Sequence, residues 1–165
     1  MAKVRDVPEW WSVAKFEIME KDESLCGIIS DYQEPPLSSK GDLFATLIKS
    51  IVGQQISVIA ASAVWGRFCD CVGEVTPESI LEKSHAQLRE VGLSNRKVEY
   101  IRGISEEWGK GLHEIEWDSL SDEEVIEELV KLRGVGRLTV EMLLIFALLR
   151  KDVFPIDDIG LIRGM

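Results

Sequence analysis

Two adjacent aspartates, Asp157 and Asp158, stand in the part of the chain best suited to chemistry. They follow the tripeptide FPI at 154–156, whose proline holds the chain extended, so they fall at an expected helix start. A helix N-terminus favours an ionised carboxylate. One interpretation is structural, with one aspartate as the N-cap and the other solvated. The alternative is a fixed carboxylate that stabilises positive charge on a substrate.

A second candidate site is the sequence LRGVGR, which lies between two segments of helical periodicity. Gly134 and Gly136 permit a tight reversal with positive φ, and Val135 between them can fill the core from the turn. The following helix begins with unpaired N–H groups that favour phosphate, and Arg133 and Arg137 flank this position. Backbone contacts of this kind read no base sequence. The alternative is an αα-hairpin whose glycines only turn the chain.

Helices must position both features, and the sequence predicts them throughout. Apolar residues recur at helical spacing over 9–21, 41–52 and 57–72. Ser84 and Ser121 are each followed three residues later by Gln or Glu, the pattern of a capping box. Sustained alternation of polar and apolar residues is missing. We therefore expect an all-α fold of about nine short helices.

Charge is unevenly distributed along the chain. The 165 residues include 19 basic and 29 acidic side chains, a net charge of −10 that argues against a nucleic-acid partner. Residues 106–128 alone hold ten acidic residues and one lysine, whereas residues 129–165 are net +2. We expect the acidic segment to be a solvated helix face, with a partner-binding surface as the alternative. Three cysteines and two histidines form no metal-ligand pattern, so no side-chain metal site is expected.

Taken together, four stretches resemble the helix-hairpin-helix (HhH-GPD) DNA glycosylase superfamily, and within it the 3-methyladenine DNA glycosylases of the second type. The stretches are 44–65, 91–101, 129–150 and 151–163. The resemblance implies an all-α, two-lobed fold with the active-site cleft between the lobes. It divides the chain into N-terminal helices of the terminal lobe, a helical-barrel lobe, the helix-hairpin-helix and the catalytic-aspartate loop, at residues 1–40, 41–120, 121–150 and 151–165.

The same resemblance implies a monofunctional base-excision repair glycosylase that hydrolyses the N-glycosidic bond of alkylated purines flipped from duplex DNA. It makes Asp158 the catalytic residue, and we assign Asp157 a capping or orienting role, although the residues themselves leave the reverse open. Cleavage builds positive charge on the deoxyribose. A carboxylate about 4 Å away, at an effective dielectric of ~20, contributes about 4 kcal/mol, on the order of a thousandfold in rate. It could also orient or deprotonate the attacking water.

Further residues take roles from the resemblance. Double-stranded DNA would be held by Arg133, Gly134, Val135, Gly136, Arg137 and Thr139, with a monovalent cation at the carbonyls of 132–137 and no required cofactor. Gln54 and Gln55 would supply a plug and base contacts, or equally cap helix ends. Leu138 and Met142 would line the base pocket, although core filling is an alternative for Met142. Leu138 replaces the lysine of bifunctional glycosylase/lyases and the tryptophan common in alkyl-purine members, which weakens the expected preference for a cationic base.

The chain ends seven residues after Asp158, where family members continue with further helices. We therefore expect a truncated chain with an incomplete terminal lobe, exposed apolar surface and self-association as one consequence. A non-catalytic helix-hairpin-helix DNA-binding module is the alternative function, and a helical interaction domain that uses its acidic face is a third. Without a leader or membrane span in the sequence, we expect a cytoplasmic, DNA-associated protein with no membrane partner.

Overall fold

The structure is a computed structural model that describes residues 7–32, 35–39 and 42–164. All regular structure in these ranges is helical, which confirms the all-α prediction. The elements are α1 (Trp10–Lys21), α2 (Glu23–Asp31), α3 (Leu43–Gly53), α4 (Val58–Val72), α5 (Pro77–Leu81), α6 (His85–Glu90), α7 (Asn95–Lys110), η1 (Leu112–Glu114), η2 (Trp117–Ser119), α8 (Asp122–Leu129), α9 (Arg137–Phe146) and α10 (Ile159–Gly164). Within the described ranges, no helix is long and apolar enough to cross a membrane.

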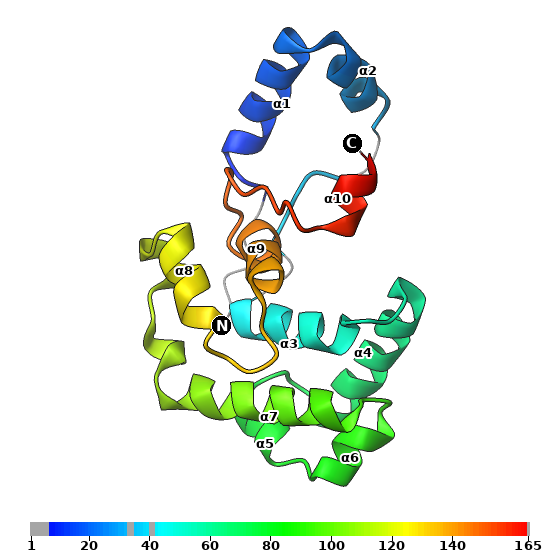
Figure 1. The fold of residues 1–165 in the computed structure, drawn as a ribbon, viewed down its shortest axis with the longest axis vertical. Coiled ribbons are helices and arrows are strands. Elements are labelled where there is room, and N and C mark those ends of the chain that lie inside the picture. The colour runs from blue at the N-terminus through cyan, green and yellow to red at the C-terminus, as the bar shows by residue number, and fades with distance from the viewer. Residues whose placement is uncertain (1–6, 33–34, 40–41, 165) are drawn as a thin grey trace.

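The helices form two groups that α9 connects (Figure 1). The larger group contains α3 to α8, and the smaller one brings α1 and α2 from the start of the chain together with α10 from its end. Helix α9 lies between the groups and packs on α3 and α8. The chain therefore passes from the α8–α9 hairpin directly into the smaller group, where Asp157 and Asp158 precede α10.

Helix α3 is the centre of the core. Its side chains Leu47, Ile48, Ile51 and Val52 are fully buried, because their spacing of three and four residues places them on one broad face. Neighbouring helices α4, α7 and α9 cover that face. Each such side chain stabilises the fold by about 1.5–3 kcal/mol relative to an exposed position. Helix α3 is therefore a rigid support for the loop that follows it.

Hydroxyl caps begin many of these helices. The side chains of Ser84 and Ser121 accept hydrogen bonds from the backbone of Gln87 and Glu124, whose side chains accept in return from the cap backbone. Both predicted capping boxes are thus confirmed, and Thr76 forms a third. Local sequence alone defines these helix starts.

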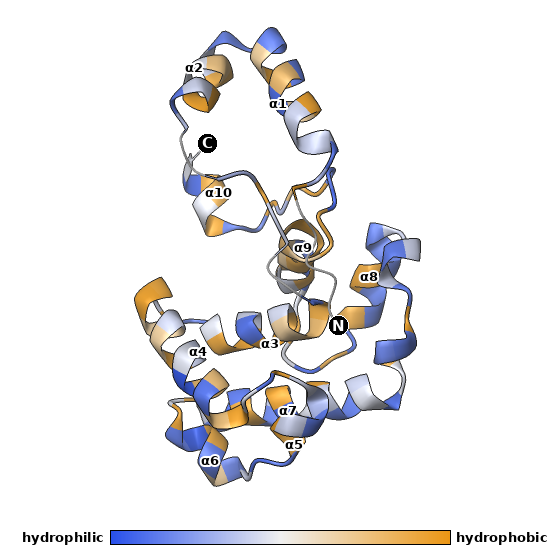
Figure 2. Ribbon diagram, turned by 180° about the vertical axis from the view of Figure 1, so that it is seen from behind, coloured by the Kyte–Doolittle hydropathy of each residue, from blue (hydrophilic) through white to orange (hydrophobic). Residues whose placement is uncertain are grey.

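The smaller group has little core of its own. Helices α1, α2 and α10 contain no buried residue. Large apolar side chains such as Phe16, Ile28 and Ile159 are exposed there, and Figure 2 shows hydrophobic positions interspersed along all three helices. The exposed apolar surface expected at this end is therefore observed, while self-association stays a prediction.

Candidate functional site

The hairpin between α8 and α9 is shaped by one glycine. Gly134 has a φ of +91°, and a Cβ added there would overlap the ring of Tyr100 from α7. Leu132 and Val135 are buried on either side of it, so Val135 fills the core as predicted. Gly136 differs, because its φ of −99° is open to any residue and the space around it is empty. The prediction of positive φ therefore holds for Gly134 alone.

Substitution of these two glycines separates their roles. Gly134→Ala is expected to destabilise the fold by at least about 1–2 kcal/mol, because the left-handed conformation is strained for alanine and the methyl group meets Tyr100. Gly136→Ala is expected to cost less than about 1 kcal/mol, since neither constraint applies. Urea unfolding of both variants measures the difference. Equal losses would show that neither the φ nor the ring contact constrains Gly134.

Gly136 leaves the first turn of α9 open. It is the N-cap of α9 and supplies no side-chain cap bond, unlike the serine caps elsewhere. The first N–H groups of α9 therefore face solvent, because the N-cap Gly136 is exposed and has no Cβ. Such a start can approach the oxygens of an anion closely.

The two arginines that flank the hairpin have different partners. Arg137 donates to both carboxylate oxygens of Glu123, at 2.9 and 3.0 Å, and to Glu141 at 3.0 Å. These bonds raise the pKa of Arg137 and hold the pKa of Glu123 below its usual range. Glu141 is buried, so Arg137 also compensates a carboxylate that water cannot reach freely. The predicted phosphate contact of Arg137 thus competes with two carboxylates, of which Glu141 was detectable from its i,i+4 spacing.

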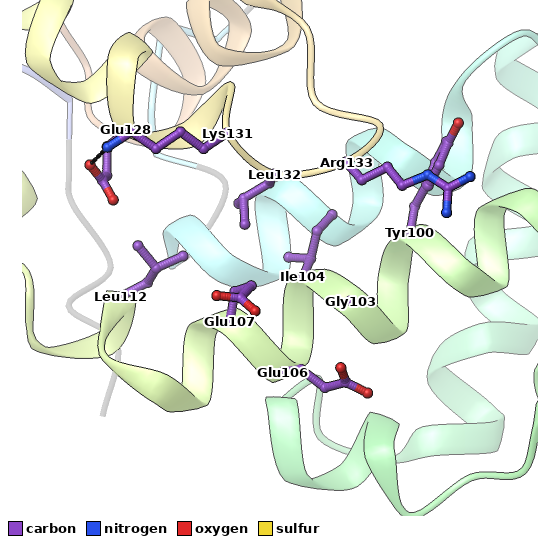
Figure 3. A pocket seen from close by; sticks show the side chains of 10 residues that line it. All are labelled: Tyr100, Gly103, Ile104, Glu106, Glu107, Leu112, Glu128, Lys131, Leu132 and Arg133. Carbon is purple, nitrogen blue, oxygen red and sulfur yellow. Dashed lines mark hydrogen bonds and ion pairs between the residues drawn. The ribbon is translucent and has the colours of Figure 1, made fainter.

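Arg133 is the more accessible of the two arginines. Its side chain is 78% exposed, with one ion pair to Glu99 at 3.5 Å. The guanidinium also lies 5.7 Å from the centre of the Tyr100 ring, within the range of a cation–π contact (Figure 3). Tyr100 thereby supports both Gly134 and Arg133, which the sequence prediction missed.

The Glu123–Arg137 pair predicts a pH dependence of stability. Since the pKa of Glu123 is lowered in the folded state, its contribution is fully present above the unfolded value near 4.5 and is lost as the pH falls through the folded value. The stability difference between the wild type and Glu123→Gln should therefore shrink between pH 6 and pH 3. Urea unfolding across that range tests it, with Glu127→Gln on the same helix as the control. A constant difference would contradict the assignment.

The loop after α3 gives its two glutamines different surroundings. The Nε2 amide of Gln54 donates to the carbonyl of Gly134 at 3.0 Å, so this side chain joins the loop to the hairpin. Gln55 is exposed and has a φ of +59°. From α7, the ammonium group of Lys97 donates to the carbonyls of Val52 and Gln54, both at 2.7 Å. Burial lowers the pKa of Lys97, which was not among the predicted site residues.

Leu138, Thr139 and Met142 lie on α9 and are all partly buried. Leu138 and Met142 are four residues apart and therefore share one side of the helix. The buried residues Val140, Leu143 and Leu144 face the core instead. Leu138 and Met142 thus form a partly buried apolar stripe on α9, and the base-pocket role stays a prediction for both.

Asp158, not Asp157, is the N-cap of α10. Its Oδ1 accepts the backbone N–H of Leu161 at 2.8 Å, and its own carbonyl accepts from Ile162 at 2.9 Å. Because Asp158 makes the cap bond, the capping role assigned to Asp157 was wrong, while its orienting role stays a prediction. The cap bond fixes the Asp158 carboxylate, because a rotation would leave the N–H without its partner. Its second oxygen keeps its lone pairs for other contacts.

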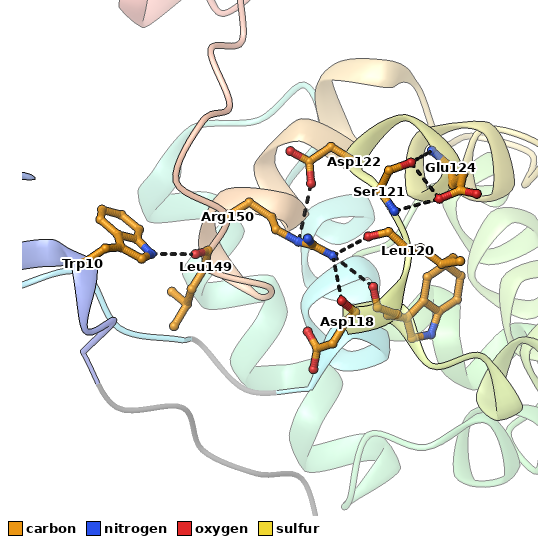
Figure 4. A network of polar contacts seen from close by, with 9 residues as sticks. Trp10, Asp118, Leu120, Ser121, Asp122, Glu124, Leu149 and Arg150 are labelled. Carbon is orange, nitrogen blue, oxygen red and sulfur yellow. Dashed lines mark hydrogen bonds and ion pairs between the residues drawn. The ribbon is translucent and has the colours of Figure 1, made fainter.

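The segment that leads to Asp158 starts from a fixed point. After α9, Arg150 donates to the carbonyls of Trp117 and Leu120, at 3.1 and 2.7 Å, and pairs with Asp122 at 3.4 Å (Figure 4). The indole of Trp10 donates to the carbonyl of Leu149 at 3.3 Å. These contacts fix the end of α9 to the acidic segment on one side and to α1 on the other.

A cavity of about 370 Å³ lies behind the hairpin, against α7 (Figure 3). Its apolar surface comes from Tyr100, Ile104, Leu112 and Leu132, and charged side chains surround it. Asp158 does not line this cavity. Across residues 7–32, 35–39 and 42–164, no group of three or more His, Cys, Asp or Glu side chains is placed to hold a metal ion.

Comparison with known proteins identifies similar sequences. Residues 48–165 match the family described as HhH-GPD superfamily base excision DNA repair protein. DNA-3-methyladenine glycosylase 1 of Schizosaccharomyces pombe is 35% identical over 150 residues, which cover 88% of this chain and 66% of the relative. A putative DNA-3-methyladenine glycosylase of Bacillus subtilis is 32% identical, over 84% of this chain and 51% of the relative. The chain thus spans about half to two thirds of the length of these curated relatives.

Solved structures share the fold. A Schizosaccharomyces pombe 3-methyladenine DNA glycosylase in complex with abasic DNA has a TM-score of 0.81 and 35% identity, over 92% of this chain and 78% of that one. The DNA-3-methyladenine glycosidase of Bacillus halodurans has a TM-score of 0.76 and 35% identity, over 99% of this chain and 75% of that one. Both similarities cover more than nine tenths of this chain.

Proposed function

The chain belongs to the HhH-GPD superfamily of base excision DNA repair proteins, and on that premise we propose that it is a monofunctional DNA glycosylase for alkylated purines of the 3-methyladenine type. The observation that carries this proposal is the carboxylate of Asp158, which a cap bond holds at the start of α10, the next helix after α9. The relatives named 3-methyladenine glycosylases support the substrate class. We also propose that the protein acts where the cell keeps its DNA.

Duplex DNA is the proposed partner of the hairpin. The open start of α9 at Gly136 supplies N–H groups for a phosphate, and exposed Arg133 supplies positive charge beside them. The net charge of −10 does not oppose this contact, because the acidic residues concentrate in 106–128. Gln55, exposed on the adjacent loop, is the proposed plug for the space that a flipped nucleotide leaves.

Asp158 is the proposed catalytic residue. One carboxylate oxygen accepts the cap bond, and the other is available to face the deoxyribose as positive charge builds on it. At about 4 Å and an effective dielectric of ~20 the interaction is about 4 kcal/mol. An N3- or N7-alkylated purine is already cationic and leaves readily, so no strong general acid is needed. Leu138 replaces the lysine that Schiff-base chemistry would need, which supports hydrolysis without lyase activity.

A monovalent cation at the hairpin carbonyls is part of the proposal. The carbonyl of Leu132 accepts one hydrogen bond, from Val135 at 3.1 Å, and that of Gly134 accepts one from Gln54 at 3.0 Å. Each oxygen has a second lone pair, so both fit a cation ligand. The cation would add positive charge near a bound phosphate, while the hairpin residues supply the ligands.

A non-catalytic DNA-binding module is the second candidate function. It is favoured by the absence of buried residues in α1, α2 and α10, since the group of helices around Asp158 then has little core to hold a substrate. This candidate shares the hairpin contacts and differs only in the absence of base release.

Substitution of the two aspartates distinguishes these functions. Asp158→Asn should lower release of methylated bases by about a thousandfold, because the charge is lost while asparagine still caps α10. Asp157→Asn should stay within a few-fold of the wild type, since that side chain is exposed. The assay measures bases released from alkylated duplex DNA and, in parallel, duplex affinity. A wild-type chain that binds the duplex and releases nothing would establish the non-catalytic module instead.

The two arginines should contribute unequally to DNA binding. Arg133→Ala is expected to weaken duplex binding and to lower the salt slope by about one, because an accessible phosphate contact is removed. Arg137→Ala should change affinity less, since its guanidinium is already paired with Glu123 and Glu141. Fluorescence anisotropy over a salt series measures both. A larger effect of Arg137→Ala would mean that DNA displaces the two carboxylates.

A further inference from the structure

Lys97 makes contacts that its position in the sequence does not predict. It lies in the first turn of α7, yet its ammonium group points inward and donates to the carbonyls of Val52 and Gln54 at the end of α3. These carbonyls lie at the negative end of the α3 dipole and have no helical N–H partner, so the ammonium group satisfies them. A lysine in a helix start would otherwise extend into water.

The same helix also supports the hairpin. Tyr100, three residues after Lys97, packs its ring against the backbone of Gly134. Residues three apart lie on one face of a helix, so α7 contacts the loop through Lys97 and the hairpin through Tyr100. The third contact joins the loop to the hairpin, because the Gln54 side chain donates to the carbonyl of Gly134 at 3.0 Å. Loop, hairpin and α7 are therefore joined pairwise.

Gln55, the next residue of the loop, has a strained backbone conformation. Its φ of +59° is a left-handed value in a residue other than glycine, and its side chain is exposed. Such a conformation is disfavoured for a residue other than glycine and persists where the surrounding contacts impose it. The contacts that immediately precede Gln55 in the chain are those of Lys97 with the carbonyls of Val52 and Gln54.

We propose that Lys97 is a positioning residue that holds Gln55 at a fixed place relative to the hairpin. The hairpin can then bind the phosphates of a duplex while Gln55 enters the base stack of the same duplex. Gln54 joins the loop to the hairpin through its bond to the carbonyl of Gly134. The inference rests on the proposed DNA binding and does not depend on base release. An inserted side chain adds affinity only where it is already ordered. If it became ordered on binding, the lost conformational entropy would offset the free energy of its contacts.

The inference separates two kinds of binding. An undamaged duplex needs only the hairpin contacts, whereas a duplex with a missing base offers a gap for Gln55. Lys97→Met should therefore reduce the preference for the gapped duplex and leave affinity for the intact duplex nearly unchanged. A role in overall folding would lower both affinities together.

The test uses the full chain and two duplexes that differ only by one tetrahydrofuran abasic-site analogue. Binding is measured for the wild type, Lys97→Met, Gln55→Ala and the double variant. Each single change is expected to lower the abasic preference on the order of tenfold, with intact-duplex affinity within about threefold. The double variant should match Gln55→Ala alone within about twofold, because Lys97 acts through Gln55.

Lys110→Met is the matched control. It removes the same charge from the same helix, at an exposed side chain paired only with Glu107 among the described ion pairs, and should leave the preference unchanged. Thermal unfolding monitors each variant. If Lys97→Met does not fold, Gln54→Met, which removes only the bond to Gly134, should show the same loss of preference.

Three results would overturn the inference. They are an equal loss for both duplexes in folded Lys97→Met, additive losses in the double variant, and a loss in Lys110→Met as large as in Lys97→Met. Failure of the proposed DNA binding is distinguishable from these results, because the wild type would then bind neither duplex. Failure of base release alone would leave the binding of both duplexes, and this inference, unchanged.

Discussion

The contact between the Gly134 backbone and the Tyr100 ring is the constraint on which the rest of the site depends. A Cβ at residue 134 would push the hairpin away from α7, and the carbonyl of Gly134 would then leave the reach of Gln54. The loop that carries Gln55 would lose its connection to the hairpin. The missing Cβ of Gly134 thus allows the close approach of the hairpin to α7, and the buried face of α3 supports the loop that Gln54 joins to the hairpin.

Ion pairs decide which charged side chains near α9 are available to a ligand. The acidic segment from 106 to 128 supplies the partners for arginines on either side of α9, Glu123 for Arg137 at its start and Asp122 for Arg150 after its end. The segment therefore does more than solvate a surface, because it fixes both ends of the helix that joins the two groups. The cost is that one of two hairpin arginines is largely neutralised, which leaves backbone N–H groups and Arg133 to meet an anion.

The end of the chain that carries Asp158 is held by a few directional contacts. The indole of Trp10 donates to the carbonyl of Leu149, Arg150 donates to the carbonyl of Trp117 in η2, and the cap bond orders the first turn of α10. Directional bonds of this kind fix orientation with little burial, so the carboxylate is well placed locally although α1, α2 and α10 bury no residue. Local order of the Asp158 carboxylate and stability of the group of helices around it are thus separate properties in this protein.

Helix content, capping boxes and the hairpin were predictable from the sequence, because spacing, cap residues and glycine act within a few residues of one another. Local pattern also located the Asp157–Asp158 pair, but it could not decide which of the two caps α10, since both residue types suit the cap equally. The different surroundings of Gln54 and Gln55, the pairing of Arg137 with Glu123 and the inward turn of Lys97 were decided by the tertiary structure alone. Each depends on a partner that packing brings close from a distant part of the chain or from a neighbouring helix, and a linear pattern does not encode that distance.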